Sequence, residues 1–431
     1  MLQVRNERIR FSVFTNMIPL VLLILIYYTR FLDTYLNPLY AVLITLFWCF
    51  QSIFLKSLTN IFFNRWSKLW LIYLFLGVFM VLIGLASANI NFYISSIPVY
   101  VLPIAGYFVV NYYNRREQLL LLVLFFAIFL ANVGWNYSLW LTYPDIFESL
   151  ESTEESVEFA AMMNIAPTPY NAVCFFSIGL VLMVLDNCRK FILSICGIVL
   201  ICFLLFYMLV INTRATAMII LLLMLVGMFI AKKEPNRKKL NNYYITNILV
   251  LVGIGFLFVL PVLVWMANNI ESERLAERLQ DLIAFTSSKG DLDNVEEGSF
   301  TKRILLIQTS LRTFLDGPIN MLIGIGEQAN GIGVDLVKVG IGNHSEFTDV
   351  LAKHGIVGGV LFWTILSTYK RWLVSLSCRR SIIKYVNVFF VIFIIYGFLN
   401  KVFQPILLIY MFFIIPISIR QLDYWVIRNR L

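Results

Sequence analysis

Long apolar stretches without a charged side chain dominate this sequence, and they restrict its fold more than any other feature. The first runs from Phe11 to Thr29, and similar runs recur almost to the C-terminus. A run of about 20 such residues crosses a bilayer as a helix, because a helix satisfies its own backbone hydrogen bonds. The composition agrees, since 60% of the residues are hydrophobic and only 14% are charged. The alternating repeats of a membrane β-barrel are not found. We therefore expect an all-α polytopic membrane protein.

The boundaries of the apolar runs predict about twelve transmembrane helices. These are 11–29, 38–55, 69–86, 95–113, 119–140, 171–185, 191–211, 215–231, 244–266, 355–369, 385–400 and 405–419. No small-residue cleavage site follows the first run, so we interpret it as a retained span and not as a signal peptide.

The distribution of charge tests this topology. With the N-terminus inside, most of the 34 basic residues fall on cytoplasmic segments, as the positive-inside rule requires. Most of the 25 acidic residues fall on two outer loops, 141–170 and 267–354. Both termini are then cytoplasmic. The net charge of +9 follows from topology and from attraction to anionic lipids, and it does not indicate nucleic-acid binding.

Three regions follow from the predicted spans. Residues 1–266 carry helices 1–9, residues 267–354 form a long helical periplasmic loop, and residues 355–431 carry helices 10–12 and a cytoplasmic tail. Within the loop, 300–315 has the pattern of a helix that ends at Asp316-Gly317-Pro318. No cysteine lies in an outer loop, and two histidines are too few for a multi-histidine metal site. We expect no metal and no cofactor.

His344 is the most informative residue of the loop. Asn343 and Glu346 have the spacing of a helix capping box, with Asn343 as the cap, and Gly355 is a natural helix stop. His344 would then lie in the first turn, where the helix dipole lowers its pKa and favours the neutral imidazole that a general base needs. His354 would lie at the opposite end, where the dipole favours the charged form. The alternative for His344 is a surface histidine at a helix start.

Three arginines are candidates for binding an anionic group. Arg214 stands in a short outer turn, where the topology rule disfavours a cation. It either reaches lipid headgroups or holds a phosphate, which suits the planar guanidinium. Arg303 and Arg312 lie nine residues apart on the predicted 300–315 helix, so they point to opposite faces. For Arg312 we favour a solvated helix charge.

The motifs around these residues resemble those of a known family. The stretch HSEFTDVLAKHGIVGG begins at His344 and ends at Gly359; TKRILLIQTSLRTFLDGPINMLIGIG and NTRAT contain the arginines. Together with the many spans and the long outer loop, they resemble the superfamily of O-antigen polymerases and O-antigen ligases. The span architecture is similar over the whole chain, and individual residues match over 211–217 and 299–360.

The resemblance implies a membrane glycosyltransferase of GT-C-like fold in the bacterial inner membrane. Its donor would be an oligosaccharide on undecaprenyl diphosphate, used in the periplasm without metal or nucleotide. By the same resemblance, Arg214 and Arg303 would bind the diphosphate, and His344 would act on the acceptor hydroxyl. Arg312, Glu346 and Asn343 are accessory candidates. Membrane lipids and a chain-length regulator protein are further expected partners.

We weigh three functions. The single motif histidine favours a polymerase that joins repeat units of O-antigen or a related surface polysaccharide. The alternative of the same chemistry is a ligase that transfers the glycan to lipid A–core. A flippase or secondary transporter of lipid-linked oligosaccharides is the third. Coupled transporters usually hold ionisable residues within the membrane, and the twelve predicted spans contain none.

Overall fold

The structure is a computed structural model that describes residues 10–29, 37–82, 90–143, 170–188, 191–208, 215–233, 299–326 and 340–428. Within these ranges every regular element is a helix. The elements are α1 (Phe11–Thr29), α2 (Asn37–Leu55), α3 (Leu58–Phe62), α4 (Arg65–Leu82), α5 (Ile90–Tyr112), α6 (Arg115–Thr142), α9 (Tyr170–Asn187), α10 (Phe191–Phe206), α11 (Ala215–Lys233), α14 (Ser299–Leu315), α15 (Pro318–Ile323), α16 (Glu346–Ser375), α17 (Arg380–Leu399), α18 (Pro405–Ile409), the π-helical turn η3 (Tyr410–Ile414) and α19 (Ile415–Arg428).

Seven helices of the described part are long and apolar enough to cross a membrane. They lie at Phe11–Thr29, Pro38–Leu55, Arg115–Thr142, Tyr170–Asn187, Glu346–Ser375, Arg380–Leu399 and Pro405–Ile427. Three shorter apolar helices lie at Ser96–Tyr112, Phe191–Phe206 and Ala217–Lys232. The chain is therefore all-helical where described and has the character of a polytopic membrane protein. The count of twelve stays a prediction, and the expected span 244–266 lies outside the described residues.

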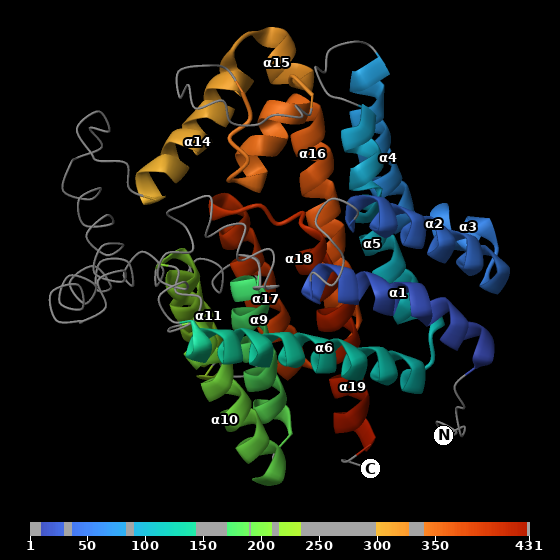
Figure 1. Cartoon of the computed structure of the whole chain (residues 1–431), viewed down its shortest axis with the longest axis vertical. Helices are drawn as coiled ribbons and strands as arrows, with labels where there is room; N and C mark the ends of the chain where they lie inside the picture. The colour runs from blue at the N-terminus through green and yellow to red at the C-terminus, as the bar shows by residue number, and fades with distance from the viewer. Residues whose placement is uncertain are drawn as a thin grey trace, which may run out of the picture.

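The helices are not all parallel. In Figure 1, α9, α17 and α19 run along the long axis, whereas α1 and α6 run across it. The short helix α15 and the neighbouring α14 lie at one end of the molecule, and both pack against α16. Length and composition, and not a common orientation, therefore mark the candidate spans.

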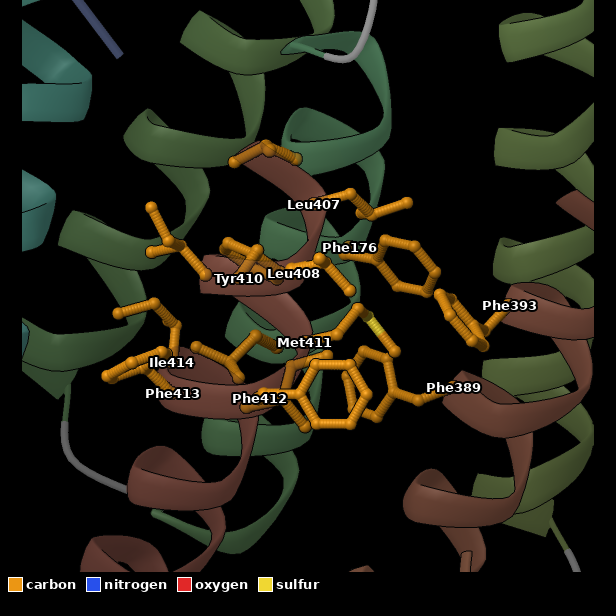
Figure 2. Packing of buried hydrophobic residues seen from close by; sticks show 14 of the residues in the cluster. Phe176, Phe389, Phe393, Leu407, Leu408, Tyr410, Met411, Phe412, Phe413 and Ile414 are labelled. Atoms are coloured by element: carbon orange, nitrogen blue, oxygen red, sulfur yellow. The ribbon is translucent and has the colours of Figure 1, made fainter. Parts of the chain in front are cut away.

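The centre of the molecule is the C-terminal segment α18–η3–α19. Of the 18-residue apolar window in Pro405–Ile427, 83% is buried. Figure 2 shows Phe176, Phe389 and Phe393 around this segment. On its other side, α5 approaches so closely that a Cβ at Gly106 would collide with the carbonyl oxygen of Phe412. The C-terminal helices are thus the interior of the bundle, and the earlier helices surround them.

Tyrosine hydroxyls complete the hydrogen bonding of this interior. Tyr28 donates to the carbonyl of Ile406 over 2.7 Å, and Tyr369 donates to the carbonyl of Met411 over 2.6 Å. An apolar interior offers the hydroxyls no water, so they donate to backbone carbonyls instead. The carbonyl of Ile406 also accepts from the backbone N–H of Tyr410. The two tyrosine bonds fix α1 and α16 to the C-terminal segment.

The start of α6 is held by a buried carboxylate. Asn114 caps the helix by accepting from the backbone N–H of Glu117, and the Glu117 side chain accepts from the backbone N–H of Asn114. Glu117 is fully buried and also accepts from the backbone and the guanidinium of Arg10. This arrangement joins the chain before α1 to the beginning of α6.

Candidate functional site

The segment 340–342 lies along one face of α14. The Thr313 hydroxyl donates to the carbonyl oxygen of Gly340 over 2.6 Å and accepts from its N–H over 2.7 Å. Further along, the N–H of Gly342 donates to the Ser310 hydroxyl over 2.8 Å. A Cβ at Gly342 would collide with the backbone carbonyl of Leu306. As the segment advances toward residue 344, it therefore moves toward the N-terminal turns of α14.

Position 303 belongs to this same face of α14. Residues 303, 306, 310 and 313 follow each other at spacings of three and four, which places them in one stripe at about 100° per residue. Arg303 is thus one turn beyond Leu306, in the direction in which 340–344 runs. Arg312 lies on the opposite face and is exposed, as the nine-residue separation predicted. Of the two predicted loop arginines, only position 303 lies on the face of α14 that contacts Gly340 and Gly342.

His344 precedes α16 and is not part of it. The N-cap is Ser345, whose hydroxyl accepts from the backbone N–H of Thr348. The prediction that Asn343 caps the helix and that His344 lies in its first turn is therefore wrong. Asn343 instead has a φ of 57°, a left-handed conformation that asparagine tolerates better than most residues. This turn of the backbone separates His344 from the segment that runs along α14.

The His344 ring has a defined orientation. Its Nδ1 lies 3.0 Å from the carbonyl oxygen of Asn343. A carbonyl oxygen only accepts, so Nδ1 carries the proton in this contact. In the neutral ring the lone pair is then on Nε2. The side chain is half-buried, and a substrate hydroxyl can approach a ring of this kind from the solvent side.

Glu346 also differs from its predicted role. Its carboxylate does not complete a capping box, and it accepts instead from the backbone N–H groups of Val402 and Phe403, both over 3.0 Å. The backbone N–H of Glu346 donates to the carbonyl of Asn400 over 3.4 Å. The cap prediction failed because a tertiary contact with the α17–α18 connection took the carboxylate. Glu346 therefore fixes the start of α16, beside His344, to the C-terminal helices.

Buried charge accompanies this helix start, and sequence reasoning missed it. Asp349 is 1% exposed and Lys353 is 7% exposed. The charges of Lys353 and of Lys401, which follows α17, both act on the carboxyl groups of Glu346 and Asp349. Residues 346, 349 and 353 are spaced by three and four, so they form one stripe of the helix. This spacing could have indicated that the three charged residues share one helix face. They were assigned to solvent because charged residues in an outer loop ordinarily are.

A hydroxyl–carboxylate contact joins α14 to α16. The Ser310 hydroxyl donates to Oδ1 of Asp349 over 2.6 Å, a short distance typical of a bond to a carboxylate. Ser310 is fully buried and simultaneously accepts from Gly342. One side chain thus connects α14, α16 and the segment that leads to His344. We call Ser310, Asp349 and Gly342 the Ser310 clamp.

The prediction that Gly355 ends the helix that begins at Ser345 is confirmed, and a second helix follows directly after a bend. Gly355 has a φ of 58° and a ψ of −158°, and the backbone continues as helix to Ser375. The bend removes the usual partners of nearby carbonyls, and the N–H groups of Ile325 and Gly326 donate to Ala352 and Lys353 over 2.9 Å each. The glycine-rich turn after α15 is therefore a set of donors for an interrupted helix.

The two halves of α16 approach closely around the bend. A Cβ at Gly358 would collide with the Cβ of His354, although residues four apart in a straight helix are about 5–6 Å apart. His354 is 1% exposed, with Nδ1 3.4 Å from Met80 Sδ and its ring 5.4 Å from that of Tyr73. His354 lies at the end of the first half of α16, as predicted, and its side chain is packed in the interior. Of the two histidines, His344 alone lies at an accessible position.

Neither the side chains of two predicted arginines nor a comparison with known proteins adds to this geometry. Arg214 lies outside the described residues, and the Arg303 side chain is likewise not described. No cluster of three or more histidine, cysteine or acidic groups suited to a metal occurs in the described ranges. No protein-family model matches the chain, and no curated protein matches it in sequence. The site is therefore argued from its own geometry.

Proposed function

We propose that this protein is a polysaccharide polymerase of the bacterial inner membrane. It would join oligosaccharide repeat units carried on undecaprenyl diphosphate into O-antigen or a related surface polysaccharide. One observation carries the proposal: the Ser310 clamp holds Gly342, two residues before His344, against the face of α14 that contains position 303. This contact supports the proposal that a base and a cation far apart in the loop sequence act together at one end of an apolar helical bundle.

In this proposal His344 acts on the acceptor sugar. Its Nε2 takes the proton of the attacking hydroxyl, and the oxygen of that hydroxyl forms the new glycosidic bond to the anomeric carbon of the donor. The bond from that carbon to the diphosphate oxygen breaks, so the lipid diphosphate leaves with an additional negative charge. Positioned arginines stabilise such a charge. Arg303, together with Arg214, is assigned this role.

The access of a lipid-linked substrate is supported by exposed apolar side chains near the site. Leu315, Ile319 and Leu322, on or just before α15, are between 57% and 62% exposed. Val360 and Trp363, on α16 after its bend, are 63% and 56% exposed. Surfaces of this kind are stable when lipid covers them. An isoprenoid chain could remain in lipid while its diphosphate reaches the His344 segment.

The accessory residues receive positioning roles. The left-handed Asn343 sets the direction of the chain before His344, and Glu346 fixes the helix start through Val402 and Phe403. Neither needs to touch the substrate. Arg312 lies on the other face of α14 and is exposed, so it has no contact with the proposed site. It provides the matched control for Arg303.

The test is a polymerisation assay with the purified enzyme and a lipid-linked repeat unit, read as a ladder on a gel. We expect His344→Ala and Arg303→Ala each to lower the rate by at least about 100-fold, as for loss of a general base or a charge-stabilising group. Arg214→Ala is expected to do the same. Arg312→Ala should retain the wild-type rate.

Two outcomes would contradict the proposal. Ladders of normal length and rate from His344→Ala would refute the role of His344 as the base. Equal losses of rate from Arg303→Ala and Arg312→Ala would refute the assignment of Arg303, and not Arg312, to the site. Each variant is checked for expression and monodispersity, so that a loss of rate can be separated from a loss of folded protein. A single transfer to lipid A–core without chain growth would identify a ligase instead.

A further inference from the structure

A cavity of about 550 Å³ lies between the last turns of α9 and α11 and the beginning of α17. The three helices pack against one another (Figure 1). The volume lies within the roughly 300–1,000 Å³ found for small-molecule sites. Its lining is apolar except for Asp186, Lys232 and Tyr385. We call it the Asp186 cavity, in which a carboxylate and an ammonium group share largely apolar walls.

The Asp186 side chain has a fixed orientation. Its Oδ2 accepts from the Tyr385 hydroxyl over 2.8 Å. The Oδ1 of the neighbouring Asn187 accepts from the Ser381 hydroxyl, also over 2.8 Å. These two hydrogen bonds fix the end of α9 to the beginning of α17. A carboxylate can accept about four hydrogen bonds, so Asp186 can also accept from a bound molecule.

Lys232 approaches the same carboxylate from α11. Its Nζ lies 4.0 Å from Oδ1 of Asp186, which is longer than the roughly 2.7–3.2 Å of an N–H···O hydrogen bond. The Lys232 side chain is 67% exposed and that of Asp186 is 28% exposed. A pair this open to its surroundings is weak and long, so Lys232 can turn to another anion at little cost. The cavity therefore offers a cation and an anion side by side, both accessible to a ligand.

The cavity has an inner end and an apolar exit. A Cβ at Gly179, seven residues before Asp186, would lie 2.8 Å from Cε of Met228, so α9 and α11 are in close contact at that depth. On the outside, Phe229 is 57% exposed. Leu222, seven residues earlier on the same face of α11, is 40% exposed. A hydrocarbon chain can therefore run from the cavity along α11.

The charge pattern of the sequence predicts where the cavity lies in the bilayer. Arg189 and Lys190 follow α9 directly, and Lys232 is the first of five basic residues in 232–239. The positive-inside rule assigns such segments to the cytoplasmic surface. We therefore expect the cavity to open at the level of the lipid head groups of the cytoplasmic leaflet.

We propose that the Asp186 cavity binds a phosphatidylethanolamine of this leaflet. The primary ammonium of the lipid donates to Asp186, its phosphate accepts from Lys232, and an acyl chain lies along Phe229 and Leu222. The head group carries one positive and one negative charge, which complements the two side chains. Hydrogen bonds from an ammonium to a carboxylate are strong, and a quaternary head group of the same net charge has no N–H to donate. The proposal is independent of the transferase reaction at His344.

The first experiment compares two lipids on the full-length protein in detergent by native mass spectrometry. The probes are dioleoyl phosphatidylethanolamine and dioleoyl phosphatidylcholine at equal concentration, which differ only in the methylation of the ammonium group. We expect the wild type to retain the ethanolamine lipid about tenfold better, as for one charge-assisted hydrogen bond. Asp186→Asn keeps an acceptor for Tyr385 and removes the charge, so it should abolish most of this preference.

Two further variants separate the contributions of the two charges. Lys232→Gln should lower the retention of both lipids by a similar factor, because both carry the phosphate, and should leave their ratio unchanged. Asp316→Asn changes an exposed carboxylate after α14, outside the cavity, and should alter neither the retention nor the ratio.

Equal retention of the two lipids by the wild type would overturn the proposal, and this result needs no variant to fold. An unchanged preference in Asp186→Asn would also overturn it. So would an equal loss of preference in Asp186→Asn and Asp316→Asn, because it would indicate a general effect of removing negative charge.

The second experiment tests whether the lipid occupies this cavity. Leu225 lines it, and Leu225→Trp places a larger side chain in the same space. Leu141→Trp is the control, because Leu141 is 61% exposed at the end of α6 and lies outside the cavity. Leu225→Trp should lower the retention of the ethanolamine lipid severalfold, and Leu141→Trp should not. Equal retention by the two variants would contradict binding in the Asp186 cavity.

Discussion

Ser310→Ala is the substitution that most directly tests how the loop is organised. The change removes the hydroxyl that donates to Asp349 over 2.6 Å and accepts from Gly342 over 2.8 Å. Ser310 is 0% and Asp349 1% exposed, so water cannot replace either bond. Leaving a buried donor or acceptor unsatisfied costs about 1–3 kcal/mol, and more for a carboxylate. Two such groups predict a loss of about 2–6 kcal/mol in the free energy of unfolding.

The measurement is the free energy of unfolding in detergent micelles, with Thr309→Ala as the matched control. The hydroxyl of Thr309 bonds only within α14, to the carbonyl of Leu305, so its removal should cost under about 1 kcal/mol. A Ser310→Ala cost no larger than that of Thr309→Ala would refute the clamp. The variant should also slow polymerisation, because a shift of about 1 Å between reacting groups can cost about 100-fold in rate.

Two further substitutions test the packing of the bundle. Gly106→Ala places a methyl group against the carbonyl of Phe412 and should destabilise the protein by about 1–3 kcal/mol. The control Gly134→Ala, with open space around its Cα, should be neutral or slightly stabilising. Equal midpoints of the two variants in thermal unfolding in detergent would contradict the close approach of α5 to Phe412. Glu117→Gln replaces an acceptor by a donor facing the guanidinium of Arg10 and should cost about 2–3 kcal/mol, measured in the same way; an unchanged midpoint would indicate that the buried carboxylate is not a structural anchor.

The helical segments and their order could be predicted from the sequence because lipid imposes a strong compositional requirement. Runs of apolar residues at helical length have one stable solution in a bilayer, and every predicted span outside 244–266 overlaps a helix of the structure. The helix predicted over 300–315 is confirmed as α14, and its end at Asp316-Gly317-Pro318 is confirmed as well. These elements depend on local pattern alone.

The helix start at the site could not be predicted, because its capping group is chosen by tertiary structure. Asn343 and Glu346 have capping-box spacing, yet the Glu346 carboxylate bonds to Val402 and Phe403. Ser345 takes the cap position instead. A local motif is overridden when a distant backbone offers two donors to the same carboxylate.

The buried charges of α16 were missed for a similar reason. Asp349 and Lys353 read as solvated residues of an outer loop, and only the fold of α14 and α15 over them makes them interior. Gly355 was correctly predicted as a helix stop, but the donors to the carbonyls of Ala352 and Lys353 before it, Ile325 and Gly326, come from a distant segment.

The non-helical backbone at Gly355 has a consequence for how this protein can change in evolution. Inserting one residue into a continuous helix rotates everything beyond it by about 100°. In α16, a rotation of the part after Gly355 need not rotate the part before it. Ile325 and Gly326 hold the turn before Gly355 from outside the helix. Insertions or deletions between 356 and 375 can therefore adapt the chain to bilayers of different thickness while the contact of Asp349 with Ser310 of α14 is kept.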